Sequence, residues 1–549
     1  MENLIILFSF TTPKQICSKI SSNIFNFTLT KILKAALSLF NRIVAKHSNF
    51  QKMKTYTILV FLFLIIFSTS VNSHPAYDNN QNIRQVHKYL FELRIHSAEN
   101  LLKAEEVKNP QNGYITYYRL YSEVIRLMIA NSTSEYKLRA PVLNEYIDKL
   151  KKLPDNNPEY RLLIGESKVF TGLLHVKYDS KFSGLIECLS GYNLLETNIE
   201  NYPEFIQSIK IPGMIQIGVS FMPKILQWGI KLLGIKGDPQ AGLKKLSDYS
   251  EFAKGKSGYE EEAFIFTMAA YKLMNQEEAL IKMIQAKKDF IKEATLMNYI
   301  AATVCAEANQ AETALDLLSN IAEEKLEIPF SPLHYLTGKA KMMRLDPDAN
   351  QQLMKYLQES TGADYLKADL YELACFYYIS GNTTLYRKYL EQVKEQGREV
   401  HNRDIEAAFE ADKTELPNLN LMRAEFLVKG GYFINAEKEL NNMPTVNLLN
   451  DGEKVRYFYL AGECQRLRKL VKDSENNYLK AFEIGKNTGD YIAQKALVQA
   501  GLLMETNGSP SEAKKYYHLS LHFKSNSNPY SDLYQNKAKA GLIRLSFPE

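Results

Sequence analysis

Toward the C-terminus, hydrophobic and small residues recur with the spacing of paired amphipathic helices. The clearest stretch is 455–486, which reads VRYFYLAGECQRLRKLVKDSENNYLKAFEIGK. In it the small pair Ala461-Gly462 is followed by Ser474 and then by Tyr478. Two antiparallel helices approach closely only where one side chain is small, and an aromatic ring then fills the space against the next repeat. The pattern therefore predicts a helix–turn–helix repeat.

The same pattern recurs from residue 259 onward. One small residue marks the first helix of each predicted pair, at Ala302, Gly338, Ala374, Ala424, Gly462, Gly501 and Gly541. The matching second-helix positions are Ala314/Leu318, Asn350/Met354, Tyr386/Leu390, Ala436/Leu440, Ser474/Tyr478 and Ala513/Tyr517. Stacked pairs of this kind form an α-solenoid. We therefore predict an all-α fold, with repeats over 259–530 and a capping helix over 531–549.

Residues 74–258 are predicted to form divergent helical repeats that precede the regular ones. The segment 211–246 stands out because it is apolar but carries Pro212, Pro223 and two lysines near its middle. Prolines and lysines in these positions are unfavourable in a membrane span. We expect a buried, kinked helix pair, in which Asp238 caps the second helix and Pro239 opens it.

The first 73 residues have the composition of a leader. Residues 1–52 are predicted to be a non-structural leader or an over-extended gene start, with translation beginning at Met53. Residues 53–73 combine a charged start, an apolar run of about twelve residues and the small-residue site Val71-x-Ser73. These features are typical of a signal peptide, and the run is short for a membrane helix. We expect an exported, periplasmic or cell-envelope protein; the alternatives are an uncleaved signal-anchor in a membrane and a mitochondrial presequence.

The positive charge of the chain resides in this leader. The full sequence has a net charge of +5, but residues 1–73 hold eight Lys and Arg and one acid. The remainder has 59 basic and 61 acidic residues, a net charge of −2. A body with this balance has no electrostatic reason to bind nucleic acid. The five cysteines are scattered without a C-x-x-C pair, so we predict packed thiols instead of disulfides or a zinc site.

The repeat region resembles the tetratricopeptide repeat superfamily, which pairs L-G with A-x3-F in its two helices. The clearest motifs lie within 459–521. A narrower resemblance, to the tetratricopeptide repeat protein 39 and inclusion-body clearance protein family, rests on Ser220-Phe-Met-Pro223 and on the turn Gly234-Ile-Lys-Gly-Asp238. Ile235 departs from the aromatic residue usual in that turn. The resemblance implies an all-helical interaction protein without established catalysis.

Catalytic and cofactor motifs are absent from the sequence: it has no H-E-x-x-H, Walker A loop, G-x-S-x-G or G-x-G-x-x-G after a strand. His518 and His522 have the i, i+4 spacing of metal ligands but lack a third ligand. The acidic run Glu260-Glu261-Glu262 is read as a solvated helix start, favoured by the helix dipole. We therefore expect no enzyme activity, no cofactor and no metal site.

The first helices of the repeats are expected to line a concave groove that binds a protein or peptide. The candidate groove residues are Tyr335, Lys339, Tyr371, Tyr378, Arg456, Tyr459, Glu463 and Arg466, with Met342, Glu425, Leu502 and Glu505 as further positions. Tyrosine and arginine often anchor interfaces. The alternative function is that of a membrane-associated or lipid-handling protein that uses the apolar segment 211–235 for peripheral membrane association.

Overall fold

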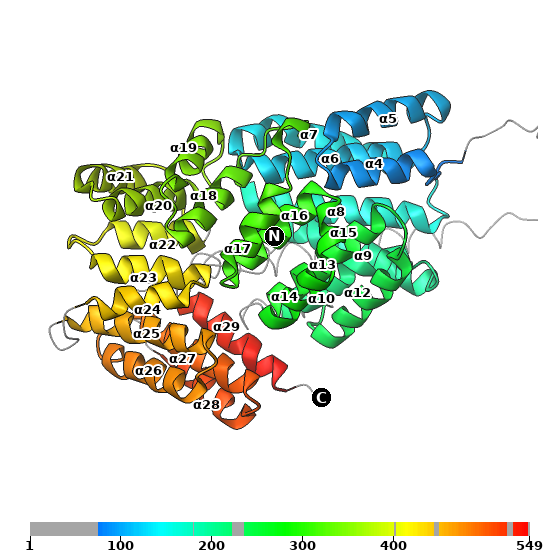
Figure 1. Cartoon of the computed structure of the whole chain (residues 1–549). Coiled ribbons are helices and arrows are strands. Elements are labelled where there is room, and N and C mark those ends of the chain that lie inside the picture. The colour runs from blue at the N-terminus through cyan, green and yellow to red at the C-terminus, as the bar shows by residue number, and fades with distance from the viewer. Residues whose placement is uncertain are drawn as a thin grey trace, which may run out of the picture. The chain divides into compact units, whose positions relative to one another are not determined.

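The structure, a computed structural model, describes residues 75–178, 181–221, 235–399, 402–443, 449–523 and 531–546. The described residues from Ala76 onward belong to one compact unit. Every regular element in these ranges is a helix (Figure 1). The predicted leader, the predicted signal peptide and both alternative start sites lie outside the described residues.

The N-terminal half consists of helix pairs joined by short connections. Its helices are α4 (Gln81–Phe91), α5 (Ile95–Lys108), α6 (Gly113–Ala130), α7 (Thr133–Leu150), α8 (Pro158–Tyr178), α9 (Lys181–Asn201), η1 (Ile206–Ile209), α10 (Lys210–Phe221), α12 (Pro239–Ala253), α13 (Tyr259–Leu273), α14 (Glu277–Ala286), α15 (Lys288–Lys292), α16 (Thr295–Glu307) and α17 (Ala311–Ser319). Most first helices pack extensively against the helix that follows them, and α8 against α9 is the most extensive of these contacts; α13 instead packs mainly against α12 and α10.

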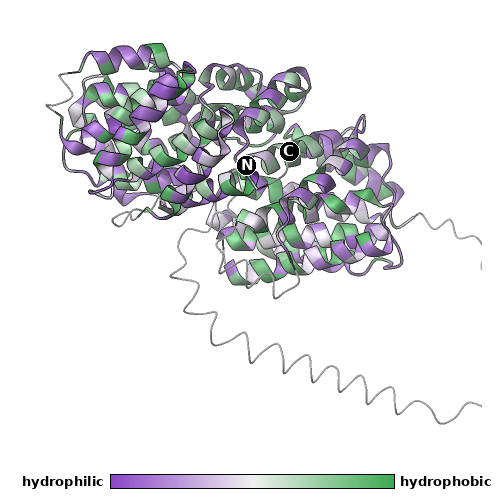
Figure 2. Ribbon diagram, turned by 90° about the horizontal axis from the view of Figure 1, so that it is seen from below, coloured by the Kyte–Doolittle hydropathy of each residue, from purple (hydrophilic) through white to green (hydrophobic). Residues whose placement is uncertain are grey.

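The C-terminal half continues the same arrangement. Its helices are η2 (Glu323–Lys325), α18 (Pro332–Arg344), α19 (Ala349–Glu359), α20 (Leu366–Ile379), α21 (Thr383–Glu395), α22 (Asn402–Ala411), α23 (Leu419–Gly430), α24 (Phe433–Asn441), α25 (Asp451–Leu467), α26 (Val471–Gly485), α27 (Tyr491–Thr506), α28 (Pro510–Leu521) and α29 (Ser531–Arg544). Apolar and polar residues share each helix (Figure 2), as expected when one face is buried. The predicted all-α solenoid is confirmed.

Small residues hold the helix pairs together as the spacing predicts. Gly462 of α25 lies against the buried ring of Tyr478 on α26, and a Cβ on this glycine would come within 2.7 Å of Cδ1. The Ser474 hydroxyl donates to the Gly462 carbonyl at 2.8 Å. The predicted small–aromatic contact is therefore present between α25 and α26.

One predicted register is wrong by a residue. The side chains of α19 that face α18 are Ala349, Leu353 and Tyr356, all buried, whereas the predicted Met354 is 37% exposed. A Cβ on Gly338 would meet Leu353 at 2.6 Å. These two contacting residues are one position closer together in the chain than Gly462 and Tyr478 are. The second helix of this pair therefore presents the preceding residue to its partner.

The apolar segment at 211–246 contains the predicted helix pair. Its helices, α10 and α12, touch at Gly213 and Gly242, and a Cβ on Gly242 would lie 2.6 Å from the Gly213 carbonyl oxygen. Asp238 caps α12 by accepting a hydrogen bond from the Ala241 amide at 3.0 Å, with Pro239 in the first turn, as predicted. Pro212 lies in the first turn of α10 and needs no kink there. Residues 222–234, including Pro223, lie outside the described residues.

The C-terminal helix α29 packs against α27 and α28 and also reaches the N-terminal half. Arg544 donates to both carboxylate oxygens of Glu505, at 2.6 and 2.7 Å, and to the Met274 carbonyl at 2.5 Å. The helix thus covers the end of the repeats, and it also fastens to the turn that follows α13.

Cysteine packing follows the prediction where the structure describes it. Cys188, Cys305, Cys375 and Cys464 are free and buried, and burial raises the pKa of the Cys305 thiol to about 12. These thiols pack as small hydrophobic groups. Cys17 lies outside the described residues.

Candidate functional site

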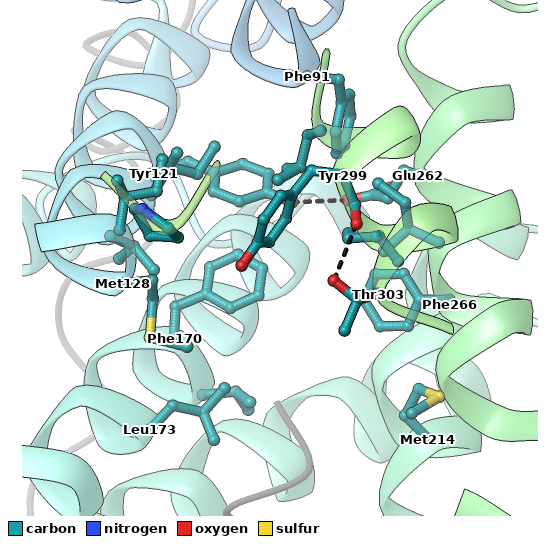
Figure 3. Close-up of a pocket in the computed structure, with 18 of the residues that line it drawn as sticks. Phe91, Tyr121, Met128, Phe170, Leu173, Met214, Glu262, Phe266, Tyr299 and Thr303 are labelled. Carbon is teal, nitrogen blue, oxygen red and sulfur yellow. Dashed lines mark hydrogen bonds between the residues drawn. The ribbon is translucent and has the colours of Figure 1, made fainter. Parts of the chain in front are cut away.

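An apolar pocket lies among the first helices of five pairs in the N-terminal half. We define it by Tyr121, Met128, Phe170, Leu173, Met214, Glu262, Phe266, Tyr299 and Thr303, with further, mostly apolar residues around them that include Phe91, Phe330 and Tyr365 (Figure 3). The nine defining residues belong to α6, α8, α10, α13 and α16. Its volume is about 210 Å³. An engineered apolar cavity of roughly 150 Å³ admits benzene, so this one has room for a larger apolar group.

Aromatic rings form much of the pocket wall. Tyr121 and Phe170 are stacked with ring centroids 4.9 Å apart, and Tyr299 meets Phe330 edge-on at 4.8 Å. Figure 3 shows the Tyr299 side chain reaching into the space between these walls. Tyr299 and Thr303 are half-buried, so the pocket is accessible along α16. A partner group that enters here meets rigid apolar surface on several sides.

A fully buried charged cluster lies beside the pocket. Lys210 of α10 forms ion pairs with Glu166 of α8, at 2.8 Å, and with Glu262 of α13, at 3.0 Å. The hydroxyls of three surrounding tyrosines donate to these carboxylates, Tyr117 to Glu166 and both Tyr249 and Tyr121 to Glu262. The cluster thereby ties four helix pairs together, because its members come from α6, α8, α10, α12 and α13.

Glu262 is the member that also lines the pocket. Burial by itself would raise its pKa, but the ammonium of Lys210 and the contact with His87, whose Nε2 lies 3.6 Å away, lower that pKa to about 2. For Glu166 the effect of burial is larger, and its pKa is raised. Glu262 is therefore an ionised carboxylate at neutral pH.

The burial of this carboxylate corrects the sequence reading of Glu260–Glu262 as a solvated helix start. Glu261 and Glu262 are 2% and 1% exposed, and only Glu260 remains accessible. Glu261 caps its own helix by accepting from the Gly258 amide, while Glu262 turns toward Lys210. The available sequence signal was a lysine and a glutamate placed within apolar helices, at Lys210 and Glu166.

The predicted groove residues of α18 and α20 lie in the wall between repeats. Tyr335 is buried and stacked on Tyr365 at 5.1 Å, and Lys339 is 3% exposed. Tyr371 and Tyr378 are half-buried, and the Tyr378 hydroxyl donates to the Pro417 carbonyl at 2.9 Å. These side chains lie on the first helices, as predicted, but their contacts are largely with the chain itself.

Four predicted groove residues lie together on α25. Arg456 forms ion pairs with Glu410 and Glu425, both at 3.2 Å. Arg466 pairs with Glu463 at 2.8 Å and donates to the Asn309 side-chain oxygen at 3.0 Å.

The fourth of these residues, Tyr459, is buried under Lys495, whose ammonium lies 4.5 Å from the ring centroid. The hydrogen-bonding capacity of the α25 set is thus mostly used within the fold, whereas the apolar pocket is hollow.

Two further features bear on chemistry. Among the described residues, no group of three or more His, Cys, Asp or Glu is placed to hold a metal ion; His522 Nδ1 lies 2.7 Å from the carbonyl oxygen of His518. Within the same described ranges, no helix has the length and apolar character to cross a bilayer.

The similarity of this chain to known proteins is remote. No protein-family model matches the chain, and no curated protein matches it. Among solved structures, the chain is similar to a chain in the crystal structure of the APC/C hetero-tetramer Cut9-Hcn1, at 12% identity. The match covers 84% of this chain and 90% of that chain, with a TM-score of 0.28. At that score the likeness carries no argument, and the repeat assignment rests on the helix packing described above.

Proposed function

We propose that this protein is a noncatalytic helical-repeat scaffold that binds a protein partner, and that an apolar side chain of the partner enters the apolar pocket. The observation that supports this is the hollow among the first helices of five pairs. First helices line the concave face of such solenoids, where partners bind. A concave, mostly apolar pocket with a few polar groups is the usual form of a binding site. The resemblance of 211–246 to the tetratricopeptide repeat protein 39 family is in keeping with this proposal.

The proposed site differs in place from the groove inferred from sequence. The pocket uses the first helices α6 to α16, whereas the predicted residues lie on α18, α20 and α25. In the pocket a partner need not displace an existing ion pair. At Arg456 it would have to compete with Glu410 and Glu425, and exchange of one charge pair for another yields little net free energy.

The test fills the pocket and leaves the rest of the surface unchanged. Thr303→Trp places an indole in the pocket from α16, and Leu173→Trp does so from the opposite wall on α8. Ser319→Trp is the matched control, because Ser319 is exposed on the second helix of the same pair as Thr303. Thermal unfolding of each variant verifies that it is folded.

The measurement is a cross-linked pull-down followed by titration of the purified partner. We expect the wild type and Ser319→Trp to bind the same protein, and both pocket variants to lose at least tenfold in affinity. Equal binding by all four proteins would refute the pocket as the site. The groove residues of α25 would then be the next surface to test.

A second candidate function, lipid handling, is favoured by the same apolar lining. Ile211, Met214 and Ile215 of α10 contribute to the pocket and begin the apolar stretch 211–235. Organic extraction of the purified wild type and of Thr303→Trp separates the two functions. A lipid recovered only from the wild type, with no protein partner, would favour lipid handling over protein binding.

We also propose that the protein acts after export, on the strength of the signal-like residues 53–73. N-terminal sequencing of the protein from its own cells tests this. A mature chain that begins near His74 would support cleavage, and one that retains residues 56–67 would support a signal-anchor or another targeting leader.

A further inference from the structure

The charges and rings of the apolar pocket indicate which partner group it prefers. Seven of the residues that line it are aromatic, among them Phe91, Tyr121 and Tyr299. Glu262 is its only charged lining residue, and no lysine, arginine or histidine lines it among the residues that the structure describes. The wall therefore combines a carboxylate with several aromatic faces, which carry negative potential at their centres.

The cations of the neighbouring cluster do not make the electrostatic potential of the pocket positive. Lys210 is 3% exposed and lies between two carboxylates, Glu166 and Glu262, at 2.8 and 3.0 Å. Its single positive charge is shared between these two carboxylates, so it leaves no excess of positive charge beside the pocket. His87 is 2% exposed and does not line the pocket, and its Nε2 lies 3.6 Å from Glu262 Oε1. Within the described part of the chain, no positive side chain thus faces the hollow to attract an anion.

The contact of Tyr121 with Glu262 also favours a positively charged partner group. Its hydroxyl donates to Glu262 Oε1 at 3.5 Å, a long contact that leaves this oxygen weakly bonded, since its other neighbour is His87 at 3.6 Å. Oε2, by contrast, accepts from Tyr249 at 2.5 Å and pairs with Lys210. The carboxylate oxygen with capacity for another donor is therefore Oε1, on the side of Tyr121, which itself lines the pocket.

From this arrangement we infer that the partner group received by the pocket is a lysine side chain set among apolar residues. The inference rests on the proposed function, since it assumes that the pocket takes a side chain of a protein partner. The methylene stem of lysine packs on apolar walls while its head remains charged. Ammonium groups bind over aromatic faces, more strongly when water is excluded, and the Glu262 carboxylate offsets the cost of removing that charge from water.

The test compares three probes of one length and different head charge: octylammonium, octanol and octanoate. Their binding to the full chain is measured by isothermal titration calorimetry. We expect octylammonium to bind about tenfold more tightly than octanoate and more tightly than octanol. Thr303→Trp should abolish binding of all three, and Ser319→Trp should leave it unchanged.

Two variants test which residues cause the preference for octylammonium. Glu262→Gln should reduce the advantage of octylammonium over octanol to about twofold or less. If that variant fails to fold, Tyr299→Leu replaces it, because Tyr299 is half-buried and presents its ring to the hollow. Its octylammonium affinity should fall several-fold, while octanol binding changes little.

Different outcomes separate the two proposals. Equal affinities for the three probes, all lost in Thr303→Trp, would overturn the lysine inference and retain the pocket as a site. A preference for octanoate would overturn it as well. An ammonium preference that persists in Thr303→Trp would place the binding elsewhere and overturn both proposals, as would failure of all three probes to bind. Two capped peptides that differ only in a central lysine or norleucine between leucines extend the test to a polypeptide, and equal binding of the two would contradict the inference.

Discussion

Gly541 of α29 lies so close to the ring of Tyr517 that a Cβ on this glycine would come within 2.3 Å of ring atoms Cε2 and Cζ. Gly501 of α27 approaches the other side of the ring, where a Cβ would come within 2.5 Å of Cε1. The ring is 1% exposed and has no room to move toward either helix. The C-terminal helix therefore docks by the same small–aromatic contact that joins the helix pairs within the repeats.

Gly541→Ala is expected to destabilise the C-terminal repeats. Overpacking a close contact costs about 1–3 kcal/mol, and the clash involves a ring that is held from both sides. Alanine gains up to about 1 kcal/mol in helix propensity over glycine, which offsets only part of that cost. The measurement is urea unfolding followed by circular dichroism. Gly452→Ala is the control, because Gly452 is exposed in the first turn of α25; it should be neutral or slightly stabilising. Equal midpoints for the two variants would contradict the prediction.

Lys210→Met is expected to destabilise the N-terminal half strongly at neutral pH. It leaves Glu166 and Glu262 buried without their shared cation, and breaking a buried ion pair on one side costs about 3–5 kcal/mol. Lys244→Met is the control, because the Lys244–Asp248 pair is exposed, and its loss should cost less than about 1 kcal/mol.

The cost of Lys210→Met should shrink as the pH falls. In the wild type the pKa of Glu262 is lowered to about 2, so its contribution is present above the unfolded pKa, near 4.5, and is lost only as the pH falls toward 2. Without Lys210 burial dominates and raises the pKa of the carboxylates, so the folded variant takes up protons at a higher pH than its unfolded state. Urea unfolding at pH 7, 5.5 and 4.5 measures this. If the difference in free energy of unfolding between the wild type and Lys210→Met is the same at all three pH values, Lys210 is not the cation that keeps these carboxylates ionised.

Tyr459→Ala is expected to lower the free energy of unfolding. Tyr459 is 6% exposed, with Tyr478 6.1 Å away by ring centroids and Lys495 over its face. Truncating a buried aromatic side chain to alanine costs about 3–5 kcal/mol. Tyr459→Phe keeps the ring, and we expect it to cost less than about 1 kcal/mol. If Tyr459→Ala leaves the unfolding midpoint unchanged, the ring is not the packed element described here. Loss of partner binding in Tyr459→Ala would have to be compared with Tyr459→Phe before it identified a binding surface.

Residue spacing along the chain was sufficient to predict the local architecture of this protein. The helix pairs, the contact of Gly462 with Tyr478 and the cap at Asp238 follow from residues close together in the chain. A small residue and a ring sixteen positions apart, as at Gly462 and Tyr478, leave few ways to pack two short helices. For the same reason the prediction failed at Leu353, where the spacing differs by one residue, because a shift of one residue rotates a helix by about 100°.

The position of the hollow and the identity of the buried charges depend on the packed fold. Glu262 meets Lys210 from 52 positions away, and no local pattern distinguishes it from the partly exposed Glu260 beside it. The predicted groove residues show the same limit: helical spacing places Arg456 on an inner face, but Glu410 and Glu425 occupy its guanidinium. Whether a charged side chain is buried and which partner it pairs with depend on many residues that are distant in the sequence. Periodicity, by contrast, reports only the face of a helix on which a residue lies.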